Sequence, residues 1–212
     1  MNIGTGRSAG PDLFLWETFM AASDQPDAIA LLKADHRKVE GLFEQFEAAT
    51  GKSQKERLAK EICTELTVHT IIEEEIFYPA CKGKAEEDLI AESYVEHDGA
   101  KVLIAEIEAG GADEEFYDAK VKVLSEQIEH HVGEEEKPSE GLFSQARKAG
   151  VDMDALGRQM AARKQELLAQ IKSGGLPTPE TRTFKGAEVE LGQPVESSGP
   201  EAGGDQERPS AR

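Results

Sequence analysis

Four segments of helical hydrophobic spacing, separated by short loop signals, constrain the fold of this chain more than any other feature. The loop signals are Gly51, the stretch 82–84, the pair Gly110 and Gly111, and Pro138, and helix-forming residues dominate between them. Connections of only a few residues force neighbouring helices to run antiparallel. The sequence therefore predicts an all-α fold in which four helices form an up-down-up-down antiparallel bundle.

Capping and stop signals set the expected bounds of these helices. Pro26 suits the first turn of a helix, Ser53 and Glu56 have the spacing of a capping box, and the Asp113 side chain can cap the fourth helix. The second helix is expected to end close to Pro79, because proline lacks a backbone N–H. The four helices are predicted at 26–50, 53–79, 85–109 and 113–137.

The flanking segments define the expected domain organisation. Residues 1–23 show no sustained period, and residues 174–212 are rich in Gly, Pro, Ser and Glu with almost no large apolar residues, a composition typical of disorder. Residues 139–149 and 152–173 read as one or two extra helices that pack on the bundle. We therefore predict a flexible segment at 1–23, a four-helix domain at 24–143, a C-terminal helix at 144–173 and a disordered tail at 174–212.

Charge and cysteine usage disfavour several classes of protein. The formal net charge of −18 repels the phosphates of nucleic acids and of anionic lipids, and no Lys/Arg run offsets it. No apolar run approaches the roughly 20 residues that span a bilayer, and no signal peptide is recognisable. Cys63 and Cys81 would lie roughly 27 Å apart along one helix, too far to pair. We expect a cytoplasmic protein that binds neither nucleic acid nor membranes.

The five histidines form a repeated pattern along the chain. One lies on each predicted helix, with a doublet on the fourth: His36, His69, His97, and the pair His130 and His131. The first two are 33 positions apart, and His97 and His131 are 34 positions apart. Counted from the connecting loops, they lie at similar heights in the bundle, with an offset of roughly 9 Å between His97 and His131. Each helical hairpin thus supplies histidines at one level of the core.

Two of these histidines are followed one turn later by a glutamate, His69 by Glu73 and His131 by Glu135. Residues i and i+4 share a helix face, so each pair can bind one metal region together. The same spacing also arises by chance in Glu-rich helices. What favours a metal site is the coincidence of one core-facing histidine per helix with two core-facing glutamates at one level. Imidazole and carboxylate suit iron, whereas the lack of thiolates disfavours structural zinc.

Helix phase decides which histidine of the doublet faces the core. The apolar residues of the fourth helix recur in steps of four, three and four, and His131 and Glu135 continue that series. The alternative pair, His130 and Glu134, shares a face with polar residues that look solvated. His131 is therefore assigned inward and His130 outward. The apolar series comprises Tyr117, Val121, Leu124 and Ile128.

Four motifs resemble those of the hemerythrin-like (HHE cation-binding) domain family over roughly residues 26–143. They are DHRKVEGLF at 35–43, HTIIEEEIFYP at 69–79, EHDGAK at 96–101 and HHVGEEE at 130–136. The resemblance implies a four-helix bundle that holds a non-haem centre of two irons, oxo- or hydroxo-bridged, with histidine and bridging carboxylate ligands. Carried over by position, the metal ligands would be His36, His69, Glu73, His97, His131 and Glu135, with Glu73 and Glu135 as the bridges.

The chain departs from the oxygen-carrying hemerythrins at one ligand. Those proteins have a second histidine one turn along the third helix, where this sequence has Lys101. Glu40 on the first helix, His130 or solvent could complete the ligand set. Tyr94, Glu74 and Glu96 are candidates to hydrogen-bond to the imidazoles and orient them, but ordinary helix surface explains each of them equally well.

Two functions fit such a centre. One is a protein that binds or senses O2, iron or reactive oxygen or nitrogen species, with O2 or another small inorganic molecule as its partner. The other is a di-iron enzyme that removes peroxide or nitric oxide, or repairs damage under oxidative stress. A ferritin-like oxidase is disfavoured, because those bundles use Glu-x-x-His and mostly carboxylate ligands.

Overall fold

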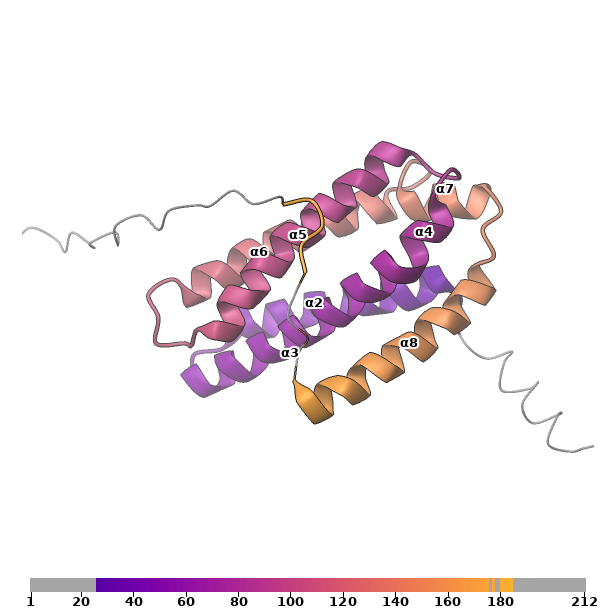
Figure 1. Cartoon of the computed structure of the whole chain (residues 1–212). Coiled ribbons are helices and arrows are strands. Elements are labelled where there is room, and N and C mark those ends of the chain that lie inside the picture. Colours follow the sequence, from indigo (N-terminus) through magenta and orange to yellow (C-terminus); the bar gives the residue numbers. More distant parts are fainter. Residues whose placement is uncertain (1–25, 176, 178–179, 185–212) are drawn as a thin grey trace, which may run out of the picture.

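The computed structural model describes residues 26–175, 177 and 180–184, and these residues form helices without a strand (Figure 1). The all-α fold class is thereby confirmed. The segment 1–23, predicted to be flexible, lies outside the described residues. The elements are α2 (Ala28–Ala48), α3 (Lys52–Ile72), the π-helix η1 (Glu73–Phe77), α4 (Tyr78–Cys81), α5 (Glu87–Ala109), α6 (Tyr117–Glu136), α7 (Leu142–Lys148) and α8 (Met153–Gly174).

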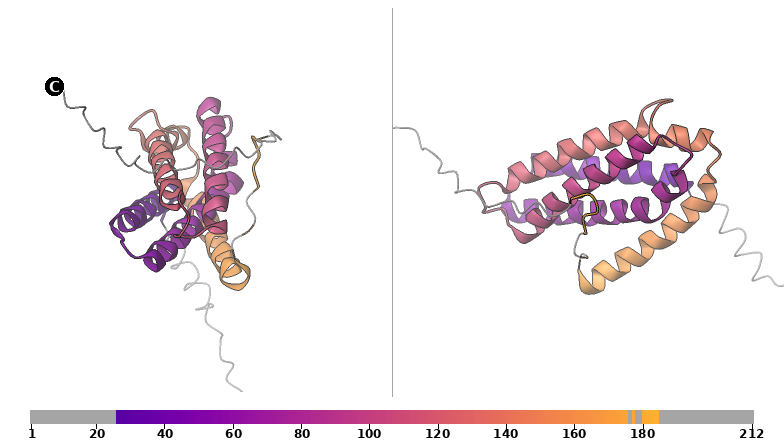
Figure 2. Two further views of the ribbon diagram at one scale, coloured as in Figure 1. Left: turned by 90° about the vertical axis from the view of Figure 1, so that its left-hand side faces the viewer. Right: turned by 45° about the horizontal axis from the view of Figure 1, so that its top comes forward.

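Four long helices surround the core of the bundle. α2 packs against α3 and α5 against α6, and contacts of α3 with α5 and of α2 with α6 complete the ring. α7 lies against α6, and α8 runs along α2 and α3 on the outside of the bundle (Figure 2). None of the described helices combines the length and apolarity that crossing a membrane requires.

The start of α2 is set by Asp27. Its side chain accepts a 2.8 Å hydrogen bond from the backbone N–H of Ala30, so that Asp27 is the N-cap and the helix begins at Ala28. An aspartate satisfies one of the free N–H groups of a first turn. Pro26, which was expected within that turn, lies just before the cap.

The predicted capping box of the second helix is wrong. α3 begins at Lys52 after the extended residue Gly51, and no side chain caps it. Ser53 therefore lies inside the first turn instead of before it. The Glu56 carboxylate turns away to the α5–α6 connection, where it accepts a 3.2 Å hydrogen bond from the N–H of Ala112.

The fourth bundle helix begins later than its predicted start at Asp113. Residues 112–116 form turns and a bend, and α6 begins at Tyr117. Asp113 is exposed and forms an ion pair with Lys52 on α3, so its carboxylate does not cap the helix. Tyr117 is 3% exposed, and its burial marks where the segment first packs on the core.

The second predicted helix ends close to Pro79, as expected, but it is not one regular α-helix. α3 passes at Glu73 into the π-helix η1, and α4 carries the chain on to Cys81. The N–H of Tyr78 donates to the Glu73 carbonyl, the i→i+5 bond that defines a π turn. A wider turn before Pro79 accommodates a residue that has no N–H to donate and whose ring crowds the preceding turn.

A polar layer divides the bundle core into two apolar clusters. One cluster contains Leu32 and Ile72 together with side chains of α7 and α8, such as Met160. The other contains Val39 and Leu124 and lies towards the α2–α3 and α5–α6 connections. Along α2 the layer falls between Leu32 and Val39, one of which belongs to each cluster.

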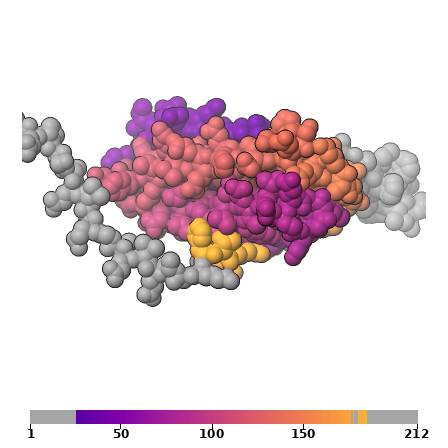
Figure 3. Space-filling model, turned by 90° about the horizontal axis from the view of Figure 1, so that it is seen from above, coloured from indigo at the N-terminus to yellow at the C-terminus, as the bar shows by residue number. Residues whose placement is uncertain are grey.

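Part of the C-terminal tail contacts the bundle. The Asp98 carboxylate on α5 accepts hydrogen bonds from Arg182 N (2.7 Å), Thr183 N (2.6 Å) and Thr183 Oγ1 (2.7 Å). Figure 3 shows residues 180–184, in yellow, on the surface of the helices. The disorder expected for 174–212 stays a prediction, but within this range one buried carboxylate binds two backbone groups and a hydroxyl of residues 182 and 183. Residues 185–212 lie outside the described part of the chain.

α8 approaches the start of α2 closely at Gly157. A β-carbon there would overlap the Pro26 carbonyl oxygen and lie 2.9 Å from Ala28 N. Gly157→Ala is expected to lower the free energy of unfolding by about 1–3 kcal/mol, the usual cost of overpacking. Gly41→Ala, in α2 with nothing within 4 Å, should raise it by about 0.5–1 kcal/mol. Urea denaturation measures both, and equal midpoints would contradict the close contact.

Candidate metal centre

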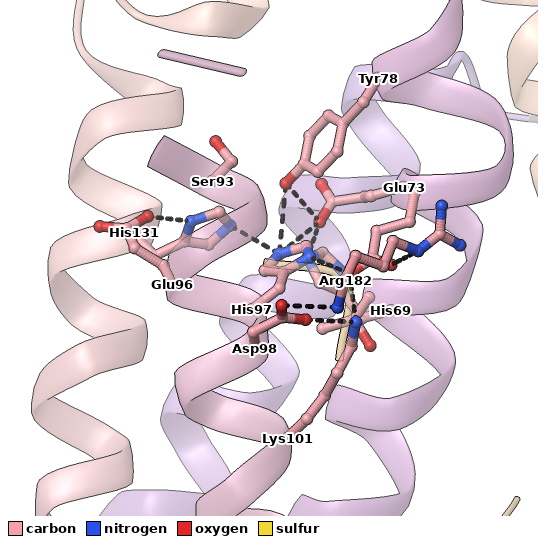
Figure 4. A network of polar contacts seen from close by, with 12 residues as sticks. His69, Glu73, Tyr78, Ser93, Glu96, His97, Asp98, Lys101, His131 and Arg182 are labelled. Atoms are coloured by element: carbon pink, nitrogen blue, oxygen red, sulfur yellow. Dashed lines mark hydrogen bonds and ion pairs between the residues drawn. The ribbon is translucent and has the colours of Figure 1, made fainter. Parts of the chain in front are cut away.

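Six buried side chains from four helices meet in the polar layer between the two apolar clusters. One histidine comes from each of α2, α3 and α5, a histidine and a glutamate come from α6, and the remaining glutamate opens η1. Each is 5% exposed or less, and Figure 4 shows four of them. The structure thus brings together all the residues that the sequence singles out as ligands: His36, His69, Glu73, His97, His131 and Glu135.

The four imidazoles form two pairs. The Nε2 atoms of His36 and His69 lie 3.2 Å apart, and those of His97 and His131 also lie 3.2 Å apart. Each pair joins two different helices of one hairpin, α2 with α3 and α5 with α6. The repeated spacing of the histidines therefore corresponds to two equivalent pairs of ring nitrogens.

The two glutamates reach from one histidine pair to the other. One oxygen of each carboxylate lies near an Nε2 atom in both pairs, as expected of a carboxylate that bridges two cations. The distances are 3.1 Å from Glu73 Oε2 to His69, 3.4 Å from Glu73 Oε2 to His97, 3.5 Å from Glu135 Oε2 to His36 and 3.7 Å from Glu135 Oε2 to His131.

The outer nitrogen of each imidazole faces a carboxylate. Three Nδ1 atoms lie at hydrogen-bond distance from a carboxylate oxygen, and the fourth, in His69, lies 3.7 Å from Asp35 Oδ2. Because an ionised carboxylate can only accept, Nδ1 carries the proton in the hydrogen-bonded rings, which directs the Nε2 lone pair to the centre. Metal-binding imidazoles adopt this tautomer. The hydrogen-bonded pairs are His36 with Glu136 (2.8 Å), His97 with Glu74 (3.2 Å) and His131 with Glu96 (2.7 Å).

Asp35 and Glu136 are site residues that the sequence pattern did not reveal. Asp35 lies directly before His36 but faces His69 on the neighbouring helix. Glu136 lies on α6 and hydrogen-bonds to His36, 100 positions earlier in the chain. Because both contacts run between helices, no spacing within a single helix could indicate them.

Burial and neighbouring charges shift the pKa values of the ionisable groups in this layer. Burial and the charge of Glu73 raise the pKa of Glu135 to about 8, while burial and repulsion from His69 lower the pKa of His36 to about 4. Although burial opposes the charged ring, Glu73 and Asp35 raise the pKa of His69. In the metal-free protein, protons therefore supply positive charge to this layer. A bound cation would take their place.

The donor atoms fit a metal ion. Glu73 Oε1 and Glu135 Oε2 are buried without a hydrogen-bond partner among the described residues, a costly state that a cation would relieve. Two groups of potential ligand atoms each fit within 4.8 Å, and they share Glu73. Cys63 and Cys81 lie in the apolar clusters, and burial raises the pKa of each to about 12. The centre is therefore built from nitrogen and oxygen donors alone, which suits iron.

The π-helix η1 places two consecutive glutamates on the centre. Glu73 lies on the inner side of the His97 ring, near its Nε2 atom. Glu74 lies on the outer side of the same ring, near its Nδ1 atom. In a regular helix adjacent side chains diverge by roughly 100°, given 3.6 residues per turn. The extra residue of the π turn locally widens the helix, and Glu73, Glu74, Phe77 and Tyr78 are all buried.

The Tyr78 hydroxyl lies in the middle of the layer (Figure 4). It is 3.2 Å from each of Glu73 Oε2, Glu135 Oε1 and His97 Nε2. Burial, together with the two carboxylates, raises the pKa of Tyr78 well above its ordinary value, so the phenol keeps its proton and can donate it. Tyr78 is a residue that the sequence pattern missed, although it lies within the motif HTIIEEEIFYP.

Two residues considered as further ligands lie away from the centre. The His130 side chain is 62% exposed and lies 3.3 Å from Glu96 Oε1 on the surface. Glu40 is 44% exposed and forms a 3.2 Å ion pair with Arg37. Neither side chain reaches the polar layer, so the structure offers no support for either as the missing ligand.

Of the three residues expected to orient the imidazoles, two contact ring nitrogens and one does not. Glu74 and Glu96 contact ring nitrogens, as described above, whereas Tyr94 packs edge-on against the Tyr78 ring with 5.3 Å between centroids. Lys101 is buried and donates a 2.6 Å hydrogen bond to Glu74 Oε1. A cation at this position thus supports the outer carboxylate where the oxygen carriers have a further imidazole.

Comparison with known proteins identifies the family. The pattern described as the hemerythrin HHE cation binding domain matches residues 27–138, more than half of the chain. The chain belongs to the hemerythrin HHE cation-binding domain family. The match covers α2 to α6 and ends before α7 and α8, which therefore lie outside the region that defines the family.

Two proteins are similar over part of the chain. A crystal structure of a hemerythrin HHE cation binding domain-containing protein from Mycobacterium kansasii matches with a TM-score of 0.60 at 24% identity, covering 71% of this chain and 94% of that one. This likeness supports the helical fold. A protein named DNA nickase from Nostoc sp. (strain PCC 7120) is 27% identical over 106 residues, half of this chain and 30% of that protein. The chain thus spans under a third of that relative's length.

The histidine doublet offers a matched pair of variants. His131 is 2% exposed and joins the polar layer, whereas the adjacent His130 lies on the surface. We expect His131→Ala to lose at least half of the bound metal, because it removes one donor and leaves Glu96 without its imidazole. His130→Ala should keep the wild-type content. Metal per chain, measured after reconstitution and desalting, separates the two, and equal losses would exclude His131 as a ligand.

Proposed function

We propose that this protein is a non-haem di-iron protein, in which His36 and His69 hold one iron and His97 and His131 the other. Glu73 and Glu135 would serve as bridges. The observation that carries the proposal is the convergence of four imidazole Nε2 atoms on two buried carboxylates. The proposal includes an up-down-up-down order of α2, α3, α5 and α6, which allows all four helices to contribute at one level.

The space beside the imidazoles favours a small inorganic ligand. The cavity there has a volume of about 10 Å³, roughly what one water molecule needs. Its walls include the apolar side chains of Val39, Leu66, Ile128 and Val132. O2, nitric oxide and peroxide match this size, whereas an organic substrate does not. We therefore propose that the centre binds or senses such a molecule.

The protein's own residues would shield the centre and orient its ligand. Phe143 of α7 stacks on His36, with 5.9 Å between ring centroids and an interplanar angle of 10°, and covers that imidazole on one side. Tyr78 is placed to donate a hydrogen bond to a small molecule held beside Glu73 and Glu135. When bound, iron supplies the redox chemistry and open coordination positions that amino-acid side chains lack.

A second candidate function is removal of peroxide or nitric oxide by the same centre. Reduction of peroxide to two waters would consume two protons and two electrons, and two bound Fe(II) ions would supply the electrons. The Tyr78 hydroxyl lies 3.2 Å from Glu135 Oε1, within reach for proton transfer. The name of the Nostoc relative suggests DNA cleavage as another activity. We do not propose it for this chain, because the match covers 30% of that relative and the net charge of −18 repels phosphate.

Anaerobic reconstitution with Fe(II) tests the proposal. The expected result is two irons per chain, together with an optical spectrum that changes on exposure to O2, peroxide or nitric oxide. A change that reverses on removal of O2 would favour binding or sensing, whereas repeated turnover of peroxide or nitric oxide would favour the enzyme. An iron content near zero would contradict both candidates.

Tyr78→Phe removes one hydroxyl and keeps the buried ring. We expect this variant to hold the wild-type amount of iron but to bind or turn over its small ligand about 5- to 13-fold less well, since a hydrogen bond of about 1–1.5 kcal/mol is lost. Tyr94→Phe, which alters the aromatic neighbour of Tyr78, should behave as wild type. Loss of iron in Tyr78→Phe would contradict a donor role and indicate that the phenol is itself a ligand.

A further inference from the structure

Three of the four carboxylates behind the imidazoles are themselves paired with lysine or arginine side chains. From the centre outwards, an imidazole is thus followed by a carboxylate and then by a cation. Two of these cations, Lys164 and Arg182, lie beyond the family match at residues 27–138. The cations are Lys33 and Arg37 behind Glu136, Lys101 and Arg182 behind Glu74, and Lys164 behind Asp35.

Lys164 of α8 supports the carboxylate that faces His69. Its ammonium group forms an ion pair with Asp35 Oδ1, while Asp35 Oδ2 lies 3.7 Å from His69 Nδ1 and has no other partner among the described residues. Asp35 is 7% exposed, so its charge depends on a nearby cation. Lys164 also lies 3.9 Å from Glu65 Oε2, but the Asp35 contact is the closer one.

Arg182 supports the carboxylate that hydrogen-bonds to His97. Arg182 Nε lies 3.0 Å from Glu74 Oε2, and Glu74 Oε1 lies 3.2 Å from His97 Nδ1. The guanidinium group also lies over the Tyr94 ring, 6.0 Å from its centroid. The hydrogen bonds from residues 182 and 183 to Asp98 fix the backbone that carries this side chain.

We propose that Lys164 and Arg182 are positioning residues of the metal centre, which act through Asp35 and Glu74 to hold the imidazoles of His69 and His97. The inference rests on the proposed iron centre. Both residues lie beyond the family match at 27–138, Lys164 on α8 and Arg182 in the segment 180–184. Each would therefore help to fix one imidazole of a histidine pair, His69 in the first pair and His97 in the second. Loss of a carboxylate that holds a ligating imidazole typically weakens metal binding by about 10–100-fold, and we expect loss of a cation that acts through this carboxylate to fall at the lower end of that range.

Lys164 has a matched control in the adjacent residue. Arg163 lies on the same helix and forms an ion pair of similar kind, 2.8 Å from Nε to Glu75 Oε2, but Glu75 faces none of the four imidazoles. Lys164→Met should release iron to a chelator at least about tenfold faster than wild type, whereas Arg163→Met should release it at the wild-type rate. Lys164→Arg, which restores the charge, should return the rate to within about threefold.

Arg182 can be tested in the same way. Arg147 has nearly the same side-chain exposure, 57% against 54%, and pairs with Asp27, a carboxylate at the surface. Arg182→Met should accelerate iron release and shift the charge-transfer absorption of the oxidised centre, because the His97 ring loses its fixed orientation. Arg147→Met should change neither, and equal behaviour of the two variants would overturn the role of Arg182.

A double-mutant cycle separates positioning from general stability. If Lys164 acts through Asp35, then Lys164→Met should add no further acceleration in an Asp35→Asn background. Additive effects would overturn the proposal, as would a Lys164→Met variant that releases iron as slowly as Arg163→Met while wild type binds two irons. Failure of wild type itself to bind iron would instead overturn the proposed function. Thermal unfolding of the metal-free variants shows whether each one is folded.

Discussion

The structure depends on one constraint, the burial of four imidazoles and two carboxylates in a single layer of an otherwise apolar core. Such groups are costly to desolvate unless charge and hydrogen bonds compensate them. The outer carboxylates accept hydrogen bonds from ring N–H groups, and lysine or arginine side chains pair with three of these carboxylates. Among the buried atoms that lack a hydrogen-bond partner within the described residues, Glu73 Oε1 and Glu135 Oε2 face inwards, while His69 Nδ1 and Asp35 Oδ2 face each other. The two inward oxygens would bind metal ions, which would replace the protons that the layer otherwise holds.

The layer also explains features of the backbone. A π turn follows α3 at Glu73, where the side chains that face the centre no longer follow regular α-helical spacing. Glu73, Glu74 and Tyr78 are all buried at this turn. The apolar clusters on either side of the layer supply the hydrophobic packing that stabilises the bundle. The π turn and the burial of the candidate ligands thus both follow from the need to place polar side chains in the core.

Much of the fold could be predicted from the sequence, because hydrophobic period and short connections act locally. The all-α class follows from such patterns, the family was indicated by the resemblance of four motifs, and the ligand residues were singled out by spacing, phase and that resemblance. Their role as ligands remains a prediction. The caps at Ser53 and Asp113 were wrong, since tertiary contacts of Glu56 and Lys52 override local preference there. The second helix does end close to Pro79, but its local hydrophobic pattern did not indicate the π turn.

The residues that no pattern indicated all act across helices. Asp35 faces the imidazole of His69 on α3. Glu136 hydrogen-bonds to the imidazole of His36 on α2, 100 positions earlier in the chain. Tyr78 lies directly after the π turn η1, and Arg182 lies in a tail whose composition indicates disorder. Such contacts depend on how helices face each other, which a single sequence does not encode in any fixed spacing.

Anomalous diffraction at the iron edge, from crystals of iron-reconstituted protein, tests the central claim most directly. Two peaks are expected in the buried layer, one between His36 and His69 and the other between His97 and His131, each within bonding distance of Glu73 or Glu135. A layer without peaks, or iron found only at the surface cluster of Glu92, Glu96 and His130, would contradict the assignment of the buried layer as a metal centre.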